Sequence, residues 1–333
     1  CFQMSVHNRN VKGEQLLEAA VMDTKFAFFE GKIVPIEEAK VSVMTHAIHY
    51  GTAVFAGMRA YWNADEEQLF IFRSADHFAR LKQSARLLLM DIPYTAQEFT
   101  HILVDLLRHE NFRQDTYIRP LVYKSYLGVG VKINDLPNEF TIFAVPMQDY
   151  LSHSDATQAC FSTWRRVDDT MIPPRGKIAG AYVNSALAKS EALMNGFDEA
   201  IVLNQDGHVS EGSAANFGIV RQGVVITPPR TANVLEGITL RTVATLLHEQ
   251  MGVEMIEHEI DRSEVYNADE AFFCGTGVQI AAVTSVDHRP IGTGKMGPVV
   301  GELRRLYDAT VRGKLPQYRD WVQPVYTEES MKA

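Results

Sequence analysis

Lys177 is the residue in this sequence with the clearest chemical potential. It lies in a segment of apolar and small residues, Ile172-Pro-Pro-Arg-Gly-Lys177-Ile-Ala-Gly-Ala-Tyr182, that leads into a helical pattern. Removing an amine from water lowers its pKa and makes it a nucleophile. Most lysines with apolar neighbours nevertheless extend their ammonium group into water. Its position alone therefore favours a structural role.

Two further features strengthen the case for a reactive lysine. Glu211 lies at the end of a predicted strand among small residues, and Gly237-Ile238-Thr239 opens a predicted helix. A glutamate in such a place is usually solvated. Together, however, these groups offer an amine that traps an aldehyde, a carboxylate that pairs with a pyridinium nitrogen, and a helix start that binds a phosphate.

Other cofactor chemistry is not indicated by the sequence. There is no P-loop and no G-x-G-x-x-G after a predicted strand. His46 and His49 are three residues apart, but no cysteine or carboxylate pattern completes a metal site, so we expect no metal. The three cysteines are too few for a disulfide framework and are interpreted as structural.

The composition points to a globular protein that acts on small molecules. The chain has 333 residues, of which 46% are hydrophobic and 22% charged, and a net charge of -9. No Lys/Arg-rich run indicates nucleic-acid binding, and no apolar stretch approaches the ~20 residues of a membrane span. We therefore expect a cytoplasmic protein. Cys1 to Gln3, ahead of Met4, are interpreted as the remnant of a tag.

The first half of the chain predicts a mixed domain of helices and strands. A helix is predicted over 12–22, and two strands within 25–35 around a Glu30-Gly31 turn. Packed helices are predicted over 42–57 and 76–90, and strands over 119–127 and 139–145.

The second half predicts the elements that carry Lys177 and Glu211. A helix over 180–195 ends at Gly196 and is followed by a β-meander from 199 to 227. A further helix over 240–250 and a strand over 271–274 follow. The predicted organisation is a tag remnant (1–3), an N-terminal extension (4–25), a small domain (26–147), a linker (148–157), a large domain (158–320) and a tail (321–333).

The chain resembles the branched-chain amino acid aminotransferases, members of the class IV pyridoxal-phosphate-dependent aminotransferases with fold type IV. The resemblance extends roughly from Phe28 to Asp308. It rests on six motifs in the family's order: His49-Tyr-Gly-Thr-Ala-Val-Phe-Ala-Gly-Met-Arg59, Tyr117-Ile-Arg-Pro-Leu121, Lys177 to Tyr182, Ser210-Glu-Gly212 to Asn216-Phe217, Gly237-Ile-Thr239, and Ala268-Asp-Glu270 leading to Gly275-Thr276. It implies an α+β protein with a smaller N-terminal α/β domain and a larger C-terminal pseudo-barrel domain.

The resemblance implies pyridoxal 5'-phosphate as the cofactor and assigns residues to it. Lys177 would hold the cofactor covalently and then move the substrate proton. Glu211 would pair with the pyridine nitrogen and Tyr182 with the ring hydroxyl. The phosphate would be bound by the residues Arg80, Ile238, Thr239 and Thr276. Without the resemblance, Arg80 would be a surface helix arginine, Thr276 a turn former and Tyr182 a packing residue.

The resemblance also implies a substrate site. The apolar pocket would be lined by Tyr50, Phe55, Tyr117, Val129, Val131 and Tyr150, with Gly57 and Arg59 shaping its wall and Gly277 nearby. Arg119, with Tyr50, would anchor the second carboxylate of glutamate. Ordinary core packing for the aromatic residues, and a buried structural ion pair for Arg119, are the alternatives.

The implied activity is transamination between L-leucine, L-isoleucine or L-valine and 2-oxoglutarate, by a homodimer or higher homo-oligomer. Two departures from the family pattern lie near the expected substrate site: Ala56 replaces a glutamate, and Gly277-Val278-Gln279 replaces Ala-Ala-Glu. The alternatives are an (R)-amine or D-amino acid aminotransferase, an aminodeoxychorismate lyase, and a catalytically idle binding module.

Overall fold

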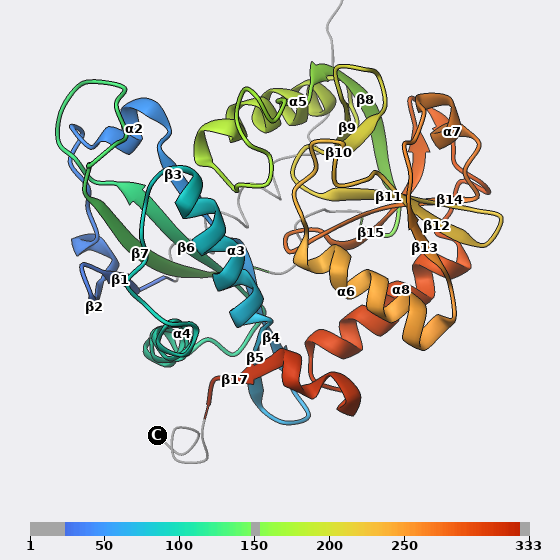
Figure 1. The fold of residues 1–333 in the computed structure, drawn as a ribbon. Helices are drawn as coiled ribbons and strands as arrows, with labels where there is room; N and C mark the ends of the chain where they lie inside the picture. Colours follow the sequence, from blue (N-terminus) through green and yellow to red (C-terminus); the bar gives the residue numbers. More distant parts are fainter. Residues whose placement is uncertain (1–23, 148–153, 327–333) are drawn as a thin grey trace, which may run out of the picture.

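The structure is a computed structural model that describes residues 24–147 and 154–326. It consists of two sheets with helices packed on them (Figure 1). The predicted tag remnant, the helix over 12–22, Tyr150, and parts of the predicted linker and tail lie outside the described residues. The mixture of helices and strands confirms the predicted α+β class.

The first sheet is antiparallel throughout, in the order β17-β5-β4-β6-β7-β1-β2, with β3 paired to β6. Its strands are β1 (Phe26–Phe29), β2 (Lys32–Pro35), β3 (Ala53–Phe55), β4 (Met58–Asn63), β5 (Gln68–Phe72), β6 (Thr116–Lys124), β7 (Asn138–Pro146) and β17 (Val322–Pro324). Helices α3 (Ser74–Leu87) and α4 (Ala96–Glu110) bury apolar residues such as Phe78, Leu81, Phe99 and Leu103 in the core beneath it.

The second sheet is mixed, in the order β10-β9-β8-β15-β14-β11-β12-β13, with β16 paired to β15. Its strands are β8 (Thr157–Arg165), β9 (Glu199–Leu203), β10 (Val209–Gly212), β11 (Asn216–Arg221), β12 (Val224–Thr227), β13 (Met255–Glu257), β14 (Glu270–Gly275), β15 (Gln279–Val286) and β16 (Arg289–Pro290). Its helices are α5 (Tyr182–Met194), α6 (Ile238–Leu246), α7 (Arg262–Tyr266) and α8 (Pro298–Val311). Among the described residues, no helix has both the length and the apolar character needed to span a membrane.

Most predicted elements are confirmed where the local pattern was strong. The hairpin β1–β2 turns at Glu30 and Gly31, which both have positive φ (49° and 80°), as a tight two-residue hairpin loop requires. The helices predicted over 76–90, 180–195 and 240–250 correspond to α3, α5 and α6, and the strands predicted over 119–127, 139–145 and 271–274 to β6, β7 and β14.

Two predictions were wrong in ways that have a physical cause. The segment 42–57 contains only the short helix α2 (His46–Tyr50), because Gly51 ends it in the left-handed conformation and Ala53–Phe55 pairs with β6 as β3. The stretch 199–227 is not a meander. β9 pairs with β10 and β11 with β12, but β8, β15 and β14 separate the two pairs. The order of the strands in the sequence does not show that β8, from earlier in the chain, and β14 and β15, from later in the chain, lie between these pairs.

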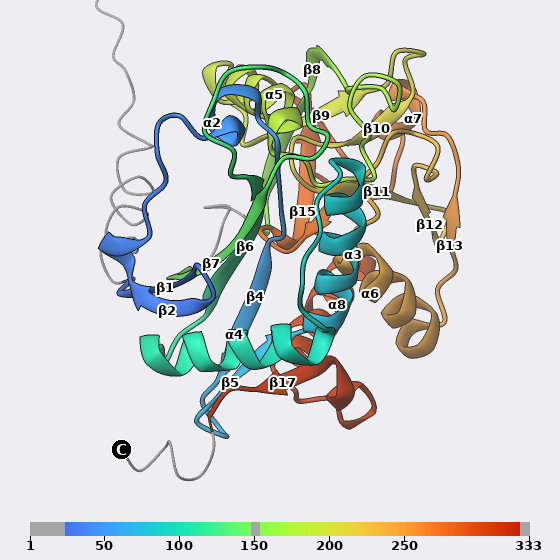
Figure 2. The ribbon, with the colours of Figure 1, turned by 60° about the vertical axis from the view of Figure 1, so that its left-hand side comes forward.

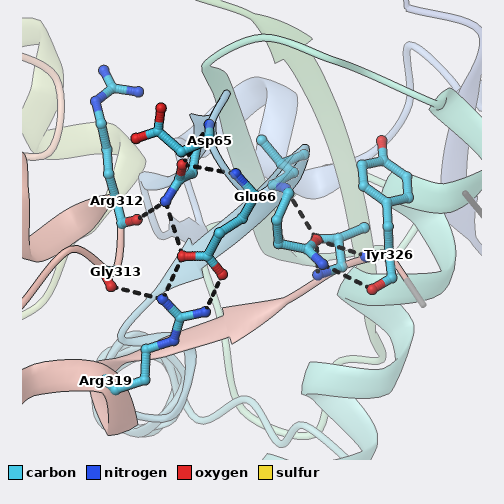
Figure 3. Close-up of polar contacts among 10 residues, drawn as sticks. Asp65, Glu66, Arg312, Gly313, Arg319 and Tyr326 are labelled. Carbon is cyan, nitrogen blue, oxygen red and sulfur yellow. Dashed lines mark hydrogen bonds and ion pairs between the residues drawn. The ribbon is translucent and has the colours of Figure 1, made fainter. Parts of the chain in front are cut away.

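The C-terminal end of the described chain returns to the first sheet. β17 pairs with β5, and the Gln68 side chain accepts hydrogen bonds from the backbone amides of Val325 and Tyr326 (Figure 3). In the same region Arg319 binds the Glu66 carboxylate through two nitrogens at 2.9 and 2.6 Å. We propose the two-domain division of the sequence analysis, with β17 as a late strand of the small domain.

Helix α3 contacts both domains. It lies between the first sheet and α6 (Figure 2). Asp76 pairs with Arg241 of α6 at 3.0 Å, and the Arg73 guanidinium donates to the Thr242 hydroxyl at 2.9 Å. A residue on α3 can therefore contact groups from both domains.

Candidate active site

A cavity of about 570 Å³ lies between the two domains, with walls from both. Most of the predicted site residues line it: Phe55, Gly57, Arg80, Tyr117, Arg119, Lys177, Tyr182, Glu211, Ile238, Thr239, Thr276 and Gly277. These residues come from segments that lie far apart in the chain. The fold thus brings together groups that the sequence separates.

Lys177 is held by its backbone and projects its amine into the cavity. Its backbone N–H donates to the Ser84 hydroxyl at 3.1 Å, and its carbonyl accepts from the amide of Phe55 at 3.0 Å. The Lys177 amine is hydrogen-bonded to the Tyr182 hydroxyl. Burial, and secondarily the charge of Arg80, lowers the pKa of Lys177 to about 7. Much of the amine is therefore neutral near pH 7, as a nucleophile requires.

Tyr182 is the second ionisable group at this end of the cavity. It is the first residue of α5, five positions after Lys177. Burial, and secondarily the nearby charge of Glu211, raises the pKa of Tyr182 to about 12. Its hydroxyl therefore keeps its proton at neutral pH and remains available as a hydrogen-bond donor.

Glu211 is a buried carboxylate in β10 with three hydrogen-bonding partners. Arg166 Nη2 lies 2.7 Å from its Oε1, and the Asn216 side chain and the Leu235 amide donate to its Oε2, each at 3.1 Å. Burial raises the pKa of Glu211, and the positive charge of Arg166 opposes that shift. Sequence reasoning missed Arg166, because nothing in its local pattern distinguishes it from its exposed neighbour Arg165.

Another part of the cavity wall is suited to an anion. Helix α6 begins at Ile238 after the extended residue Gly237, and no side chain caps its first amides. Unpaired amides at a helix start bind anions. Arg80 reaches the same place and donates to the Glu236 carbonyl at 3.1 Å. Burial lowers the pKa of Arg80 to about 10, so the group is still a cation at neutral pH.

A third part of the cavity wall is formed by two aromatic rings and the Arg119 guanidinium. Arg119 donates to the Tyr117 hydroxyl from Nη2 at 2.9 Å, and its guanidinium lies 4.5 Å from the centre of the Phe55 ring. Gly57 leaves room for this arrangement, since a β-carbon at position 57 would clash with the Tyr117 hydroxyl oxygen. Gly57 therefore allows the Tyr117 ring to pack closely against it in the cavity wall.

Several predicted substrate residues do not line this cavity in the single chain. Arg59 is 1% exposed and donates to the Met147 carbonyl at 3.3 Å, and it is not among the residues that line the cavity. Tyr50 accepts a hydrogen bond from the amide of Gly130 at 2.9 Å, on the loop that carries Val129 and Val131. Those two valines are 88% and 80% exposed. Tyr150 lies outside the described residues.

The two departures from the family pattern fall in different places. The Ala56 side chain is buried in the core of the first domain and does not line the cavity. Gly277 lies in the cavity wall, in the turn between β14 and β15. Only the second departure therefore affects the shape of this cavity.

The residues of this cavity fit pyridoxal 5'-phosphate. A partly buried amine, a phenol, a buried carboxylate, an arginine and the uncapped start of a helix all line it. These are the groups that bind an aldehyde, a ring hydroxyl, a ring nitrogen and a phosphate.

Comparison with known proteins agrees with this chemistry. The family model for amino-transferase class IV matches residues 53–286. A probable branched-chain-amino-acid aminotransferase from Aquifex aeolicus is 49% identical over 311 residues, which are 93% of this chain and 99% of that protein. A branched-chain aminotransferase from Thermoproteus uzoniensis, solved with norvaline, has a TM-score of 0.87 and 40% identity over 91% of this chain and all of its own. The T.th. branched-chain amino acid aminotransferase, complexed with N-(5'-phosphopyridoxyl)-L-glutamate, has a TM-score of 0.86 and 37% identity over 91% of this chain and 99% of its own. These structural neighbours confirm the predicted fold, and the chain belongs to the class IV aminotransferases.

Proposed function

We propose that this aminotransferase moves the amino group between L-branched-chain amino acids and 2-oxoglutarate. The observation that carries the proposal is that Phe55, Tyr117 and Arg119 form one wall of the cavity that contains the amine of Lys177. An apolar side chain can pack on the aromatic rings, and a second carboxylate can pair with the guanidinium. The solved relatives with norvaline and with a glutamate adduct support recognition of both kinds of substrate.

The chemistry divides between the cofactor and the protein. Pyridoxal 5'-phosphate supplies an electron sink for the pair of electrons left at the substrate Cα when its proton is removed. Lys177 would hold the cofactor, and its amine would accept the proton from the substrate Cα. Its low pKa leaves the amine neutral and able to accept that proton.

Other residues of this chain orient the reacting groups. Glu211, whose negative charge is stabilised by Arg166, would keep a proton on the ring nitrogen of the cofactor. Tyr182, which is hydrogen-bonded to the Lys177 amine, would donate a hydrogen bond to the ring hydroxyl. The phosphate would be bound by Arg80, the amides of Ile238 and Thr239, and the Thr276 hydroxyl.

We further propose that two copies of the chain form the working enzyme. A patch of exposed apolar residues surrounds α2 and the 126–131 loop: Val43, Met44, Ile48, Leu127, Val129 and Val131. A second copy would cover this patch and receive Val129, Val131 and Tyr50 at the edge of its own cavity. Sedimentation of a fully active monomer would contradict this assembly. A cytoplasmic location remains part of the proposal.

A panel of half-reactions tests the substrate assignment. The purified enzyme with bound cofactor is mixed with single L-amino acids, D-amino acids or (R)-amines, and the loss of the cofactor's visible absorbance is followed. We expect fast loss with L-leucine, L-isoleucine, L-valine and L-glutamate. Fast loss with D-amino acids or (R)-amines, and slow loss with the L-series, would replace the proposed substrates.

A further inference from the structure

Ser84 joins the backbones of two site residues through one hydroxyl. It lies on α3, one turn after Arg80, and its exposed fraction is zero. Its Oγ donates to the Arg80 carbonyl at 3.0 Å and accepts from the Lys177 backbone N–H at 3.1 Å. A hydroxyl has one proton and two lone pairs, so it can make both bonds at once.

The bond to Ser84 is part of a wider attachment of Lys177 to the first domain. The Lys177 carbonyl accepts from the amide of Phe55, and Ile178 forms a bridge with Val54. Both backbone polar groups of Lys177 are therefore held by the first domain. Because residues four apart in a helix are separated by about 6 Å along its axis, α3 fixes Arg80 at a short, constant distance from the point where Lys177 is attached.

We propose that Ser84 is a positioning residue that sets the spacing between the Lys177 amine and the phosphate-binding Arg80. This inference rests on the cofactor-binding roles proposed above for Lys177 and Arg80. A rigid ligand with an aldehyde at one end and a phosphate at the other engages both residues only when their spacing matches its own. Once the first end is bound, the second binds as an intramolecular event, and its contribution depends on that match. A ligand with the aldehyde alone does not depend on it.

The test compares two aldehydes, pyridoxal 5'-phosphate and pyridoxal, which lacks the phosphate. Cofactor-free enzyme is titrated with each, and the ratio of the two dissociation constants measures the preference for the phosphate. In Ser84→Ala we expect this preference to fall by roughly 10-fold, since the Lys177 N–H loses its partner and the spacing relaxes. Ser84→Thr, which keeps the hydroxyl, should restore most of it. If the alanine variant does not fold, Ser84→Cys, with a weak S–H donor, gives the same comparison.

Thr310 provides a matched control. It is 1% exposed, lies on α8 and donates to the Leu306 carbonyl at 2.8 Å, the same bond type that Ser84 makes to Arg80. Thr310→Val should lower the melting temperature without changing the preference for the phosphate. An equal loss of preference in Thr310→Val and Ser84→Ala, or an unchanged preference in a folded Ser84→Ala, would overturn the inference.

Arg80→Ala separates this inference from the proposed function. If Arg80 binds the phosphate, this variant loses much of the preference for pyridoxal 5'-phosphate over pyridoxal. An unchanged preference in Arg80→Ala would contradict the assignment of Arg80 and, with it, the inference. A loss in Arg80→Ala together with a normal preference in Ser84→Ala would remove only the role of Ser84.

Discussion

Arg166 and Glu211 form a buried ion pair, with Arg166 Nη2 2.7 Å from Glu211 Oε1. The two side chains are 12% and 5% exposed. Arg166 directly follows β8 and Glu211 lies in β10, and these are the two strands that flank β9 in the second sheet. A carboxylate so far from water needs a nearby cation to remain charged. Arg166 therefore stabilises the charged form of Glu211, the form that the proposed contact with a protonated ring nitrogen needs.

Glu211→Gln should raise the activation free energy of the chemical step by several kcal/mol, because a neutral amide cannot hold the ring nitrogen protonated. The affinity for the cofactor should fall only modestly. Single-turnover rates with L-leucine measure the effect. An unchanged rate would show that Glu211 is only a structural partner of Arg166.

Arg166→Met should lower the free energy of unfolding by about 3 kcal/mol, since it leaves the buried charge of Glu211 without its ion-pair partner.

Lys177→Ala should abolish transamination while the fold survives. The variant loses the amine, but the surrounding residues are mostly apolar and small and accept alanine. Activity by coupled assay and circular dichroism of the same preparation check the two halves of this prediction. Turnover close to that of the wild type would refute the assignment of Lys177.

The reaction of cofactor-free enzyme with pyridoxal should depend on pH with a midpoint near 7. Below the pKa of Lys177, about 7, the amine is protonated and unreactive, and above it the amine is neutral and reacts. The charge of Arg80 contributes to this low pKa, so Arg80→Gln should move the midpoint upward. Stopped-flow rates between about pH 5.5 and about pH 9, taken as a range around the expected midpoint, test both statements. A midpoint above about 9 in the wild type would contradict the environment described here.

Gly57→Ala should impair the enzyme by displacing Tyr117, whose hydroxyl oxygen would clash with the new β-carbon. Since Tyr117 also binds Arg119, we expect kcat/KM for 2-oxoglutarate to fall by roughly 10-fold or more. In the double variant Gly57→Ala with Tyr117→Phe, removal of the hydroxyl relieves the clash. The double variant should therefore resemble Tyr117→Phe alone, and strictly additive losses would argue against a steric mechanism.

Arg119→Ala should affect one class of substrate selectively. A charged contact to the distal carboxylate is available to 2-oxoglutarate but not to leucine. We expect kcat/KM for 2-oxoglutarate to fall by roughly 10- to 100-fold, about 1.4 to 3 kcal/mol, with a much smaller change in the half-reaction with L-leucine. Equal losses would mean that Arg119 is structural or binds the α-carboxylate, and would favour an amine or D-amino acid aminotransferase.

The sequence by itself determined the elements with strong local signals and the residues with recognisable motifs. The Glu30-Gly31 turn, the periodicity of α3 and the strand composition of β6 and β7 depend on near neighbours in the chain, and these predictions were confirmed. Lys177, Glu211 and Arg119 were identified because each lies within a motif of the family. The residues of the cavity could therefore be proposed before their positions were known.

Tertiary structure decided what depends on partners distant in sequence. In the sequence, nothing distinguishes Arg166 from Arg165 or Ser84 from any other serine in a helix. Only the fold places Glu211 of β10 beside Arg166 and the Lys177 amide beside Ser84. The strand order around β8, β14 and β15 likewise follows from non-local pairing. Local propensity carries no information about such contacts, because their energy comes from burial and hydrogen bonding between segments that meet only in the folded chain.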